Sequence, residues 1–198
     1  MSAVGFDLDM TLVDTRRGIA TALRALAEET GRPIDVEAIV GSLGPPVAVA
    51  LSPWFEPAEL PDVVQRFRRH MAEVGVLGVD AMPGAAAAID AVRAAGHEVI
   101  VVTSKIEPLA RATLANAGLK ADDVFGNVWA EAKAEPLRLR RAVCYVGDHS
   151  ADMAAASAAG VPGFGVTSGA TTRDELFAAG AKHVAASLDE FPAWLDAI

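Results

Sequence analysis

Residues 3–14 read AVGFDLDMTLVD, a short apolar run that ends in two aspartates, Asp7 and Asp9. The run from Ala3 to Phe6 is continuously apolar rather than alternating, which is typical of a strand covered on both faces, as in a parallel sheet. A buried carboxylate is costly unless it is paired or bound to a metal. The stretch therefore predicts a buried strand that ends in two carboxylates, which we expect to be paired or bound to a metal.

The composition indicates a folded protein without a broad basic surface. The chain has 198 residues, of which 52% are hydrophobic and 22% are charged, so a substantial core is available and disorder is not expected. The formal net charge of -9 argues against a nucleic-acid partner, which would normally meet a basic face. It leaves a small anionic substrate open, because a site can be locally positive inside an acidic protein.

Cysteine usage and the first residues predict a cytoplasmic protein. Cys144 is the single cysteine, so no internal disulfide can form, and we expect it to pack inside a strand. The first fifteen residues hold three aspartates and lack the basic segment of a signal peptide. No apolar stretch approaches the roughly 18 uncharged residues of a membrane span. We therefore expect no membrane partner, and a monomer or a homodimer.

Further apolar runs alternate with helix-favouring stretches along most of the chain. Helices are expected at 84–95, 107–117 and 151–159, each rich in alanine. Strands are expected, after the first at 3–7, at 97–104, 124–129, 142–148, 161–166 and 182–186. Alternation of this kind predicts the α/β class, with a doubly wound, Rossmann-like parallel sheet.

The interval from Thr15 to Met82 breaks this alternation, since it contains no convincing strand. Its helices are expected at 16–30, 36–41, 47–51 and 58–74. We interpret residues 16–82 as an all-helical insertion between the first and second strands, and residues 1–15 and 83–198 as the α/β core.

Unusual polarity gathers at the expected carboxyl ends of the strands, where doubly wound sheets bind their ligands. Four aspartates in one crevice cannot all stay ionised unaided, and such an oxygen-rich cluster suits Mg²⁺. A nearby lysine would supply a positive charge that binds a phosphoryl group at the same site, so a small phosphorylated metabolite is the expected partner. The residues at these ends are Asp7, Asp9, Thr11, Thr103, Ser104, Lys105, Asp148 and Asp152, with Lys133 in the loop after the third strand.

Four ordered segments resemble the signatures of the haloacid dehalogenase superfamily. The resemblance covers the core, roughly residues 3–14 and 83–170, and the helical insertion, residues 16–82, resembles the helical cap of that family. Within the family, the nearest relatives look like phosphoglycolate phosphatases. The segments are FDLDMTLVDT (6–15), VVTSK (101–105), KAEP (133–136) and VGDHSADMAAASAAG (146–160).

The resemblance implies a phosphatase that works through two carboxylates of unequal role. Asp7 would be the nucleophile that forms an aspartyl-phosphate, and Asp9 the general acid and then the general base. Dehalogenases of the family lack a carboxylate at the position of Asp9, because a departing halide needs no proton. Thr103 would hold phosphoryl oxygens, and Lys133 would neutralise charge there and orient Asp7.

The resemblance also implies the remaining ligands of substrate and metal. Asp148 would bind Mg²⁺ together with Asp7 and Asp9, the latter through its carbonyl, and Asp152 would support this metal shell. The substrate-binding residues implied are Leu8, Thr11, Ser104 and Lys105.

Several features of these segments leave alternatives open. Met10 stands where family phosphatases usually carry glycine. The connection from Lys133 to Asp148 spans only fifteen positions, which is short for a parallel crossover, so Lys105 is the alternative phosphate-binding lysine. Thr103 and Ser104 would also suit as caps of the following helix, and His149 as the cap of the helix after it. The basic run Arg66, Arg68, Arg69 and His70 is typical of a solvated helix face, although one member could reach substrate.

Other functions remain open at this stage. A sugar phosphomutase would use the same aspartates, and a phosphorylatable switch or a non-catalytic interaction protein would keep the same scaffold. A dinucleotide-binding domain is disfavoured, because no Gly-x-Gly-x-x-Gly segment follows the first strand.

Overall fold

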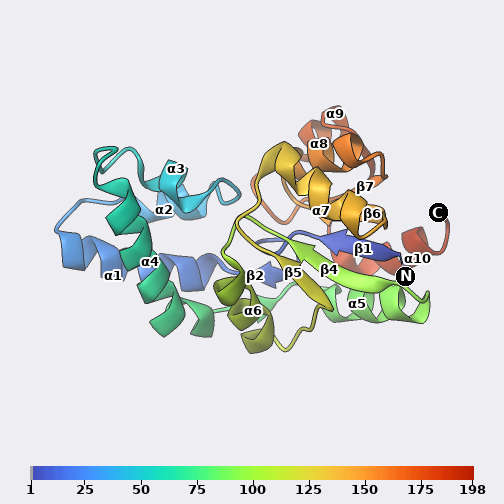
Figure 1. The fold of residues 1–198 in the computed structure, drawn as a ribbon, viewed down its shortest axis with the longest axis horizontal. Helices are drawn as coiled ribbons and strands as arrows, with labels where there is room; N and C mark the ends of the chain where they lie inside the picture. Colours follow the sequence, from blue (N-terminus) through green and yellow to red (C-terminus); the bar gives the residue numbers. More distant parts are fainter. Residues whose placement is uncertain (1) are drawn as a thin grey trace.

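The computed structural model describes residues 2–198, and within them a parallel sheet of six strands forms the centre of the fold (Figure 1). The strand order is β5-β4-β1-β6-β7-β8, which is the classical doubly wound order with a reversal between β1 and β6. The strands are β1 (Ala3–Phe6), β4 (Glu98–Val102), β5 (Asp123–Phe125), β6 (Ala142–Gly147), β7 (Gly163–Val166) and β8 (Ala181–Ala185). The predicted α/β class and doubly wound sheet are confirmed.

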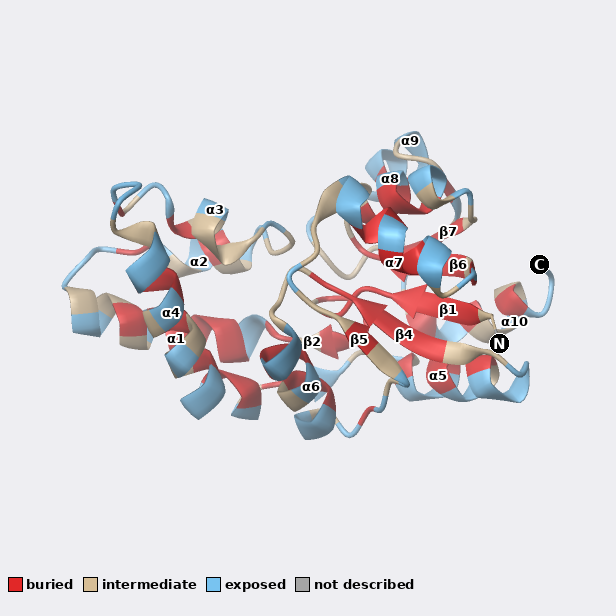
Figure 2. Ribbon diagram, viewed as in Figure 1, coloured by how far each residue is buried: buried red, intermediate tan, exposed pale blue. Residues whose placement is uncertain are grey.

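Helices cover both faces of this sheet, which explains why its strands are apolar throughout (Figure 2). Val4 and Phe6 of β1 belong to the core cluster under one face, whereas Ala3 belongs to the cluster under the other. On the first face lie α5 (Ala85–Ala94), α6 (Glu107–Asn116) and α10 (Phe191–Leu195), and on the second lie α7 (Ala134–Leu139), α8 (Ser150–Ala159) and α9 (Arg173–Ala178).

Strand register brings the carboxyl ends of β1, β4 and β6 together at one end of the sheet, which is called the sheet edge below. Phe6 pairs with Val101 on one side and with Val146 on the other. The residues that follow β1, β4 and β6 therefore emerge side by side. This is the edge where the sequence predicted the functional residues.

A helical segment leaves and rejoins the α/β part through a short antiparallel ribbon of β2 (Val13–Asp14) and β3 (Asp80–Ala81). The expectation of no strand between Thr15 and Met82 is wrong at β3, because a two-residue strand is too short to show a periodic pattern. In Figure 1 the segment stands beside the sheet edge rather than on its faces. Its helices are α1 (Arg16–Thr30), α2 (Val36–Val40), α3 (Val47–Leu51), α4 (Leu60–Glu73) and the 3₁₀ turn η1 (Gly75–Leu77).

The helical segment has a hydrophobic cluster of its own. Leu23 of α1, Leu51 of α3 and Phe67 of α4 are buried in it. Leu109 of α6 joins the same cluster from the α/β part, so the two parts share an apolar contact. Within residues 2–198, none of the helices combines the length and the apolar character needed to cross a membrane.

Candidate active site

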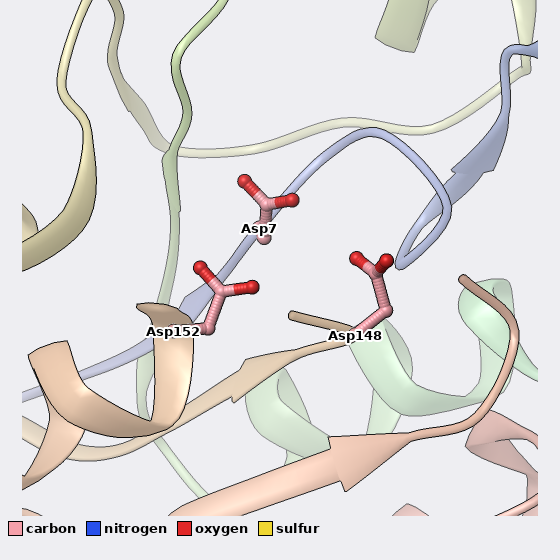
Figure 3. Close-up of side chains that lie close together, drawn as sticks. All are labelled: Asp7, Asp148 and Asp152. Carbon is pink, nitrogen blue, oxygen red and sulfur yellow. The ribbon is translucent and has the colours of Figure 1, made fainter. Parts of the chain in front are cut away.

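Three buried carboxylates meet where β1 and β6 end (Figure 3). Asp7 follows β1, Asp148 follows β6, and Asp152 lies in the first turn of α8. One carboxylate oxygen from each lies within 4.8 Å of the others. The backbone sets this meeting, since the Asp7 N–H donates to the Val146 carbonyl at 2.8 Å and so continues the β1–β6 pairing.

Lys133 supplies the positive charge inside this cluster. Its Nζ donates to Oδ1 of Asp7 at 2.8 Å and to Oδ1 of Asp152 at 2.7 Å, and the residue is only 1% exposed. Burial disfavours the ammonium, yet the Asp152 and Asp7 carboxylates outweigh it and raise the pKa of Lys133 well above its ordinary value. Lys133 therefore stays charged. It reaches the site from the 3₁₀ turn η2 (Ala130–Lys133), which leads directly into the six-residue helix α7.

The donor set fits a divalent cation. Burial, opposed by Lys133 and reinforced by Asp152, raises the pKa of Asp7 to about 7. Burial and the negative charges of Asp7 and Asp152 also raise the pKa of Asp148 well above its ordinary value. With all three carboxylates ionised against one ammonium, the cluster carries two excess negative charges. A hard cation with oxygen ligands, such as Mg²⁺, would balance that excess, and Asp7 and Asp148 offer the carboxylates for it.

Neighbouring loops hold Asp148 in place. The Thr11 hydroxyl donates to Oδ1 of Asp148 at 2.8 Å. A β-carbon at Gly169, in the loop after β7, would lie 1.8 Å from Oδ2 of the same carboxylate, so no other residue fits there without displacing it. The neighbouring Ser168 hydroxyl donates to the carbonyl of Met10.

Sequence reasoning missed the contributions of Ser168, Gly169 and Tyr145. The Tyr145 hydroxyl donates to the Val102 carbonyl at 2.9 Å and also lies 3.3 Å from Oδ1 of Asp152. The segment Thr167-Ser168-Gly169 follows an expected strand, so its place at a strand end was a usable signal for the loop. Tyr145 is the one hydroxyl-bearing residue of its apolar strand, but the sequence gives no sign that this hydroxyl reaches Asp152.

Asp9 lies outside the carboxylate cluster and pairs with the other lysine. Lys105 Nζ donates to Oδ1 of Asp9 at 2.8 Å, and both side chains are largely buried. The two lysines are thus divided between the two carboxylates of the first motif. Lys133 contacts Asp7, whereas Lys105 contacts Asp9.

The residues after β4 face both the site and the helical segment. Thr103 is buried, and its Oγ1 accepts from the Lys105 N–H at 3.2 Å. The Ser104 hydroxyl donates to the carbonyl of Gly44, between α2 and α3, at 3.3 Å. The reading of Thr103 and Ser104 as helix caps is wrong, because α6 has Ile106 at its N-cap position.

Three further expectations are decided by local geometry. His149 caps α8, with Nδ1 accepting from the Ala151 N–H at 3.0 Å. The Leu8 side chain is fully buried in the core cluster, so it does not reach the cavity. Met10 has a φ of 61°, the left-handed region that glycine adopts without strain, so its backbone conformation is the one glycine would favour at this position.

A cavity of about 90 Å³ opens between this edge of the sheet and the helical segment. Asp7, Asp9, Ser104 and Lys105 line it from the α/β part. The rest of its wall comes mostly from apolar side chains of α1 to α4 and α6. A small molecule held there would place one end against the carboxylates and the other among the helices.

Comparisons with known proteins agree with this architecture. The family model of haloacid dehalogenase-like hydrolases matches residues 4–157. A phosphoglycolate phosphatase from Cupriavidus necator is 34% identical over 215 aligned positions, covering 98% of this chain and 93% of that protein. A phosphoglycolate phosphatase from Rhodospirillum rubrum is 34% identical, covering 81% of this chain and 77% of that protein. The chain belongs to the haloacid dehalogenase-like hydrolase family.

A solved structure shows the same fold. A crystal structure described as a predicted phosphatase from Clostridium acetobutylicum superposes with a TM-score of 0.85 at 21% identity, covering 100% of this chain and 99% of the other. The family match and the sequence relatives together make the chain a phosphatase, that is, a phosphoric monoester hydrolase.

Proposed function

We propose that the chain is a Mg²⁺-dependent phosphatase that hydrolyses a small phosphorylated metabolite through an aspartyl-phosphate on Asp7. The observation that carries the proposal is the contact of Asp7 with the buried ammonium of Lys133 at the wall of a cavity that Asp9 also lines. Relatives of the chain that are named phosphoglycolate phosphatases support a phosphate ester as the substrate class.

Asp7 attacks first. One of its carboxylate oxygens forms a bond to phosphorus while the bond from phosphorus to the ester oxygen breaks, and Asp9 gives its proton to that departing oxygen. Lys133 holds the attacking carboxylate through the 2.8 Å hydrogen bond and offsets the negative charge that arrives with the phosphoryl group. The Thr103 hydroxyl and the Ser104 backbone N–H would hold the phosphoryl oxygens.

Water completes the reaction. Asp9 takes a proton from the water that attacks phosphorus, and the bond between phosphorus and the Asp7 oxygen breaks. Free phosphate leaves and both carboxylates return to their starting state.

Asp7, Asp148 and the Asp9 carbonyl would hold the metal, with Asp152 supporting them and Thr11 fixing Asp148. When bound, Mg²⁺ supplies neutralising charge and polarises a phosphoryl oxygen. The residues proposed to hold the cation are thus the ones whose excess negative charge it would balance.

The helical segment would act as a cap. Residues 16–82 would form this cap domain and residues 1–15 and 83–198 the core, with the cap closing over the site to exclude bulk water. The Ser104–Gly44 hydrogen bond and the apolar contact of Leu109 with the helical cluster support this arrangement.

Phosphate release from a panel of phosphorylated metabolites with Mg²⁺ tests the proposal. The wild-type protein should release phosphate from at least one of them. The Asp7→Asn protein, which keeps the size of the side chain and loses the nucleophile, should release none. Equal turnover by the two proteins would rule out Asp7 as the nucleophile.

A further inference from the structure

The helical segment contributes an almost entirely apolar wall to the cavity above the carboxylates. Ile19 and Leu23 of α1, Val47 of α3, and Phe67 and Met71 of α4 line it. Such a wall offers few hydrogen-bonding partners for the hydroxyl groups of a sugar, and desolvating those groups without replacing their partners is costly. It is equally poorly matched to glycolate, whose alcohol part is a single methylene and a carboxylate.

Arg68 is the one charged side chain that the helical segment brings to this cavity among the described residues. Its neighbours in the basic run of α4 are already paired. Arg66, Arg69 and His70 all contact Glu29 on the outside of the segment. Within residues 2–198, Arg68 has no ion pair.

The two sides of the cavity, the α/β part and the helical segment, therefore have different chemistry. At the sheet edge, Asp7 and Asp9 are compensated by Lys133 and Lys105, each at 2.8 Å. The helical segment lines the cavity with Arg68, whose charge is uncompensated within residues 2–198, and otherwise with apolar side chains. An uncompensated guanidinium beside an apolar surface is suited to a carboxylate or a phosphate of a ligand.

We propose that the substrate is a phosphate monoester whose alcohol part is an apolar carbon skeleton of more than two carbons ending in an anionic group, which Arg68 binds. This proposal rests on the proposed phosphatase function and names the substrate class of the same site. The anionic group is a carboxylate or a second phosphate. The volume of the cavity, about 90 Å³, favours a short skeleton over a long acyl chain.

A matched substrate series tests the proposal with the full-length protein and Mg²⁺. The first set is ω-phosphooxyalkanoates of two to six carbons, whose shortest member is phosphoglycolate. The second set is the matching alkyl phosphates, which lack the terminal anion, and the third is the matching diol bisphosphates. Glucose 6-phosphate serves as the hydroxyl-rich comparison. The measured quantity is kcat/KM for phosphate release.

For the wild-type protein, kcat/KM should rise beyond two carbons by about fourfold for each methylene that becomes buried. A terminal anion should raise it by a further 10-fold to 100-fold, roughly the range of a hydrogen bond to a charged group. The carboxylate and bisphosphate sets show which anion is preferred. Glucose 6-phosphate should be the poorer substrate.

Two variants separate recognition by Arg68 from a general effect of charge on α4. Arg68→Met should lose the advantage of the terminal anion, so that its kcat/KM for the phosphooxyalkanoates falls to its kcat/KM for the matching alkyl phosphates. Its activity with the alkyl phosphates also shows that the variant folds. Arg69→Met removes the neighbouring arginine that is paired with Glu29, and it should behave as the wild type does.

The possible failures are distinguishable. Highest activity with phosphoglycolate or with glucose 6-phosphate would overturn this proposal and leave the phosphatase function standing. The same holds if Arg68→Met keeps the preference for the anion. Phosphate release no higher than that of Asp7→Asn across every substrate would overturn both proposals together.

Discussion

Replacing Lys133 by methionine should destabilise the protein strongly, because it leaves buried carboxylates without their counter-charge. Lys133 is 1% exposed and bonded to Asp7 at 2.8 Å and to Asp152 at 2.7 Å. Methionine keeps much of the side-chain volume but removes the ammonium. Breaking a buried pair by removing one partner costs about 3–5 kcal/mol. For a chain of this size, that corresponds to a fall in Tm of about 10 °C.

The cost of Lys133→Met should also depend on pH. Burial raises the pKa of Asp7 to about 7 and raises that of Asp148 well above its ordinary value. A carboxyl whose pKa is raised by folding destabilises the folded state as pH rises through that value. Near pH 5 Asp7 is therefore largely protonated, and removal of the lysine leaves less uncompensated charge. Near pH 8 Asp7 is largely ionised beside Lys133 in the wild-type protein, so the cost of removing the lysine should be larger there.

Urea unfolding of the metal-free protein at pH 5 and pH 8 provides the measurement, with chelator present throughout. Lys105→Met is the matched control, since the Lys105 ammonium makes one hydrogen bond within residues 2–198, to Asp9, and the side chain is 10% exposed. We expect this control to cost less than about 2 kcal/mol, in the range of one hydrogen bond to a charged group. A cost for Lys133→Met no larger than for the control, or a larger cost at pH 5 than at pH 8, would refute the reasoning.

Three further predictions follow from the same geometry. Mg²⁺ should raise the Tm of the metal-free protein more at pH 8 than at pH 5.5, because protons compete for Asp7 and Asp148, whose pKa values are raised; equal increments by calorimetry would contradict this. Met10→Gly should be more stable than Met10→Ala by about 1 kcal/mol in chemical denaturation, because the φ of 61° strains any residue with a β-carbon; the opposite order would mean that this strain is absent. Gly169→Ala should lower kcat by about 100-fold in a phosphate-release assay, because the new methyl group displaces the Asp148 carboxylate. An unchanged kcat would show that catalysis does not need this carboxylate in its present place.

The elements of the fold could be predicted because their signals are local. Helix α1 occupies 16–30 as expected, and the strands at 3–7, 97–104 and 142–148 were expected within two residues of their observed ends. Continuous apolar runs and helix-favouring stretches report burial and backbone preference within about ten residues. The two-residue strand β3 and the short helices α9 and α10 were missed, since so few residues carry no period.

The identity of the chemical groups was likewise visible in the sequence, because residue type at a strand end limits what chemistry is available. Carboxylates after the first and fourth expected strands already pointed to a metal and a phosphate. Which lysine meets which carboxylate was not visible. Lys133 and Asp7 are 126 positions apart, and only the register of β1 against β6 and the turn of η2 bring them together.

Tertiary structure also decided what each member of a similar set does. Arg68 and Arg69 of α4 are adjacent and alike in sequence, yet Arg68 lines the cavity while Arg69 pairs with Glu29. In the sequence Gly169 is one of many loop glycines, and only the structure shows that the Asp148 carboxylate leaves no room for a side chain there. The physical reason is the same in each case. Local sequence sets the backbone and the burial of a residue, whereas its partners depend on segments that only the packed sheet and the helical segment bring into contact.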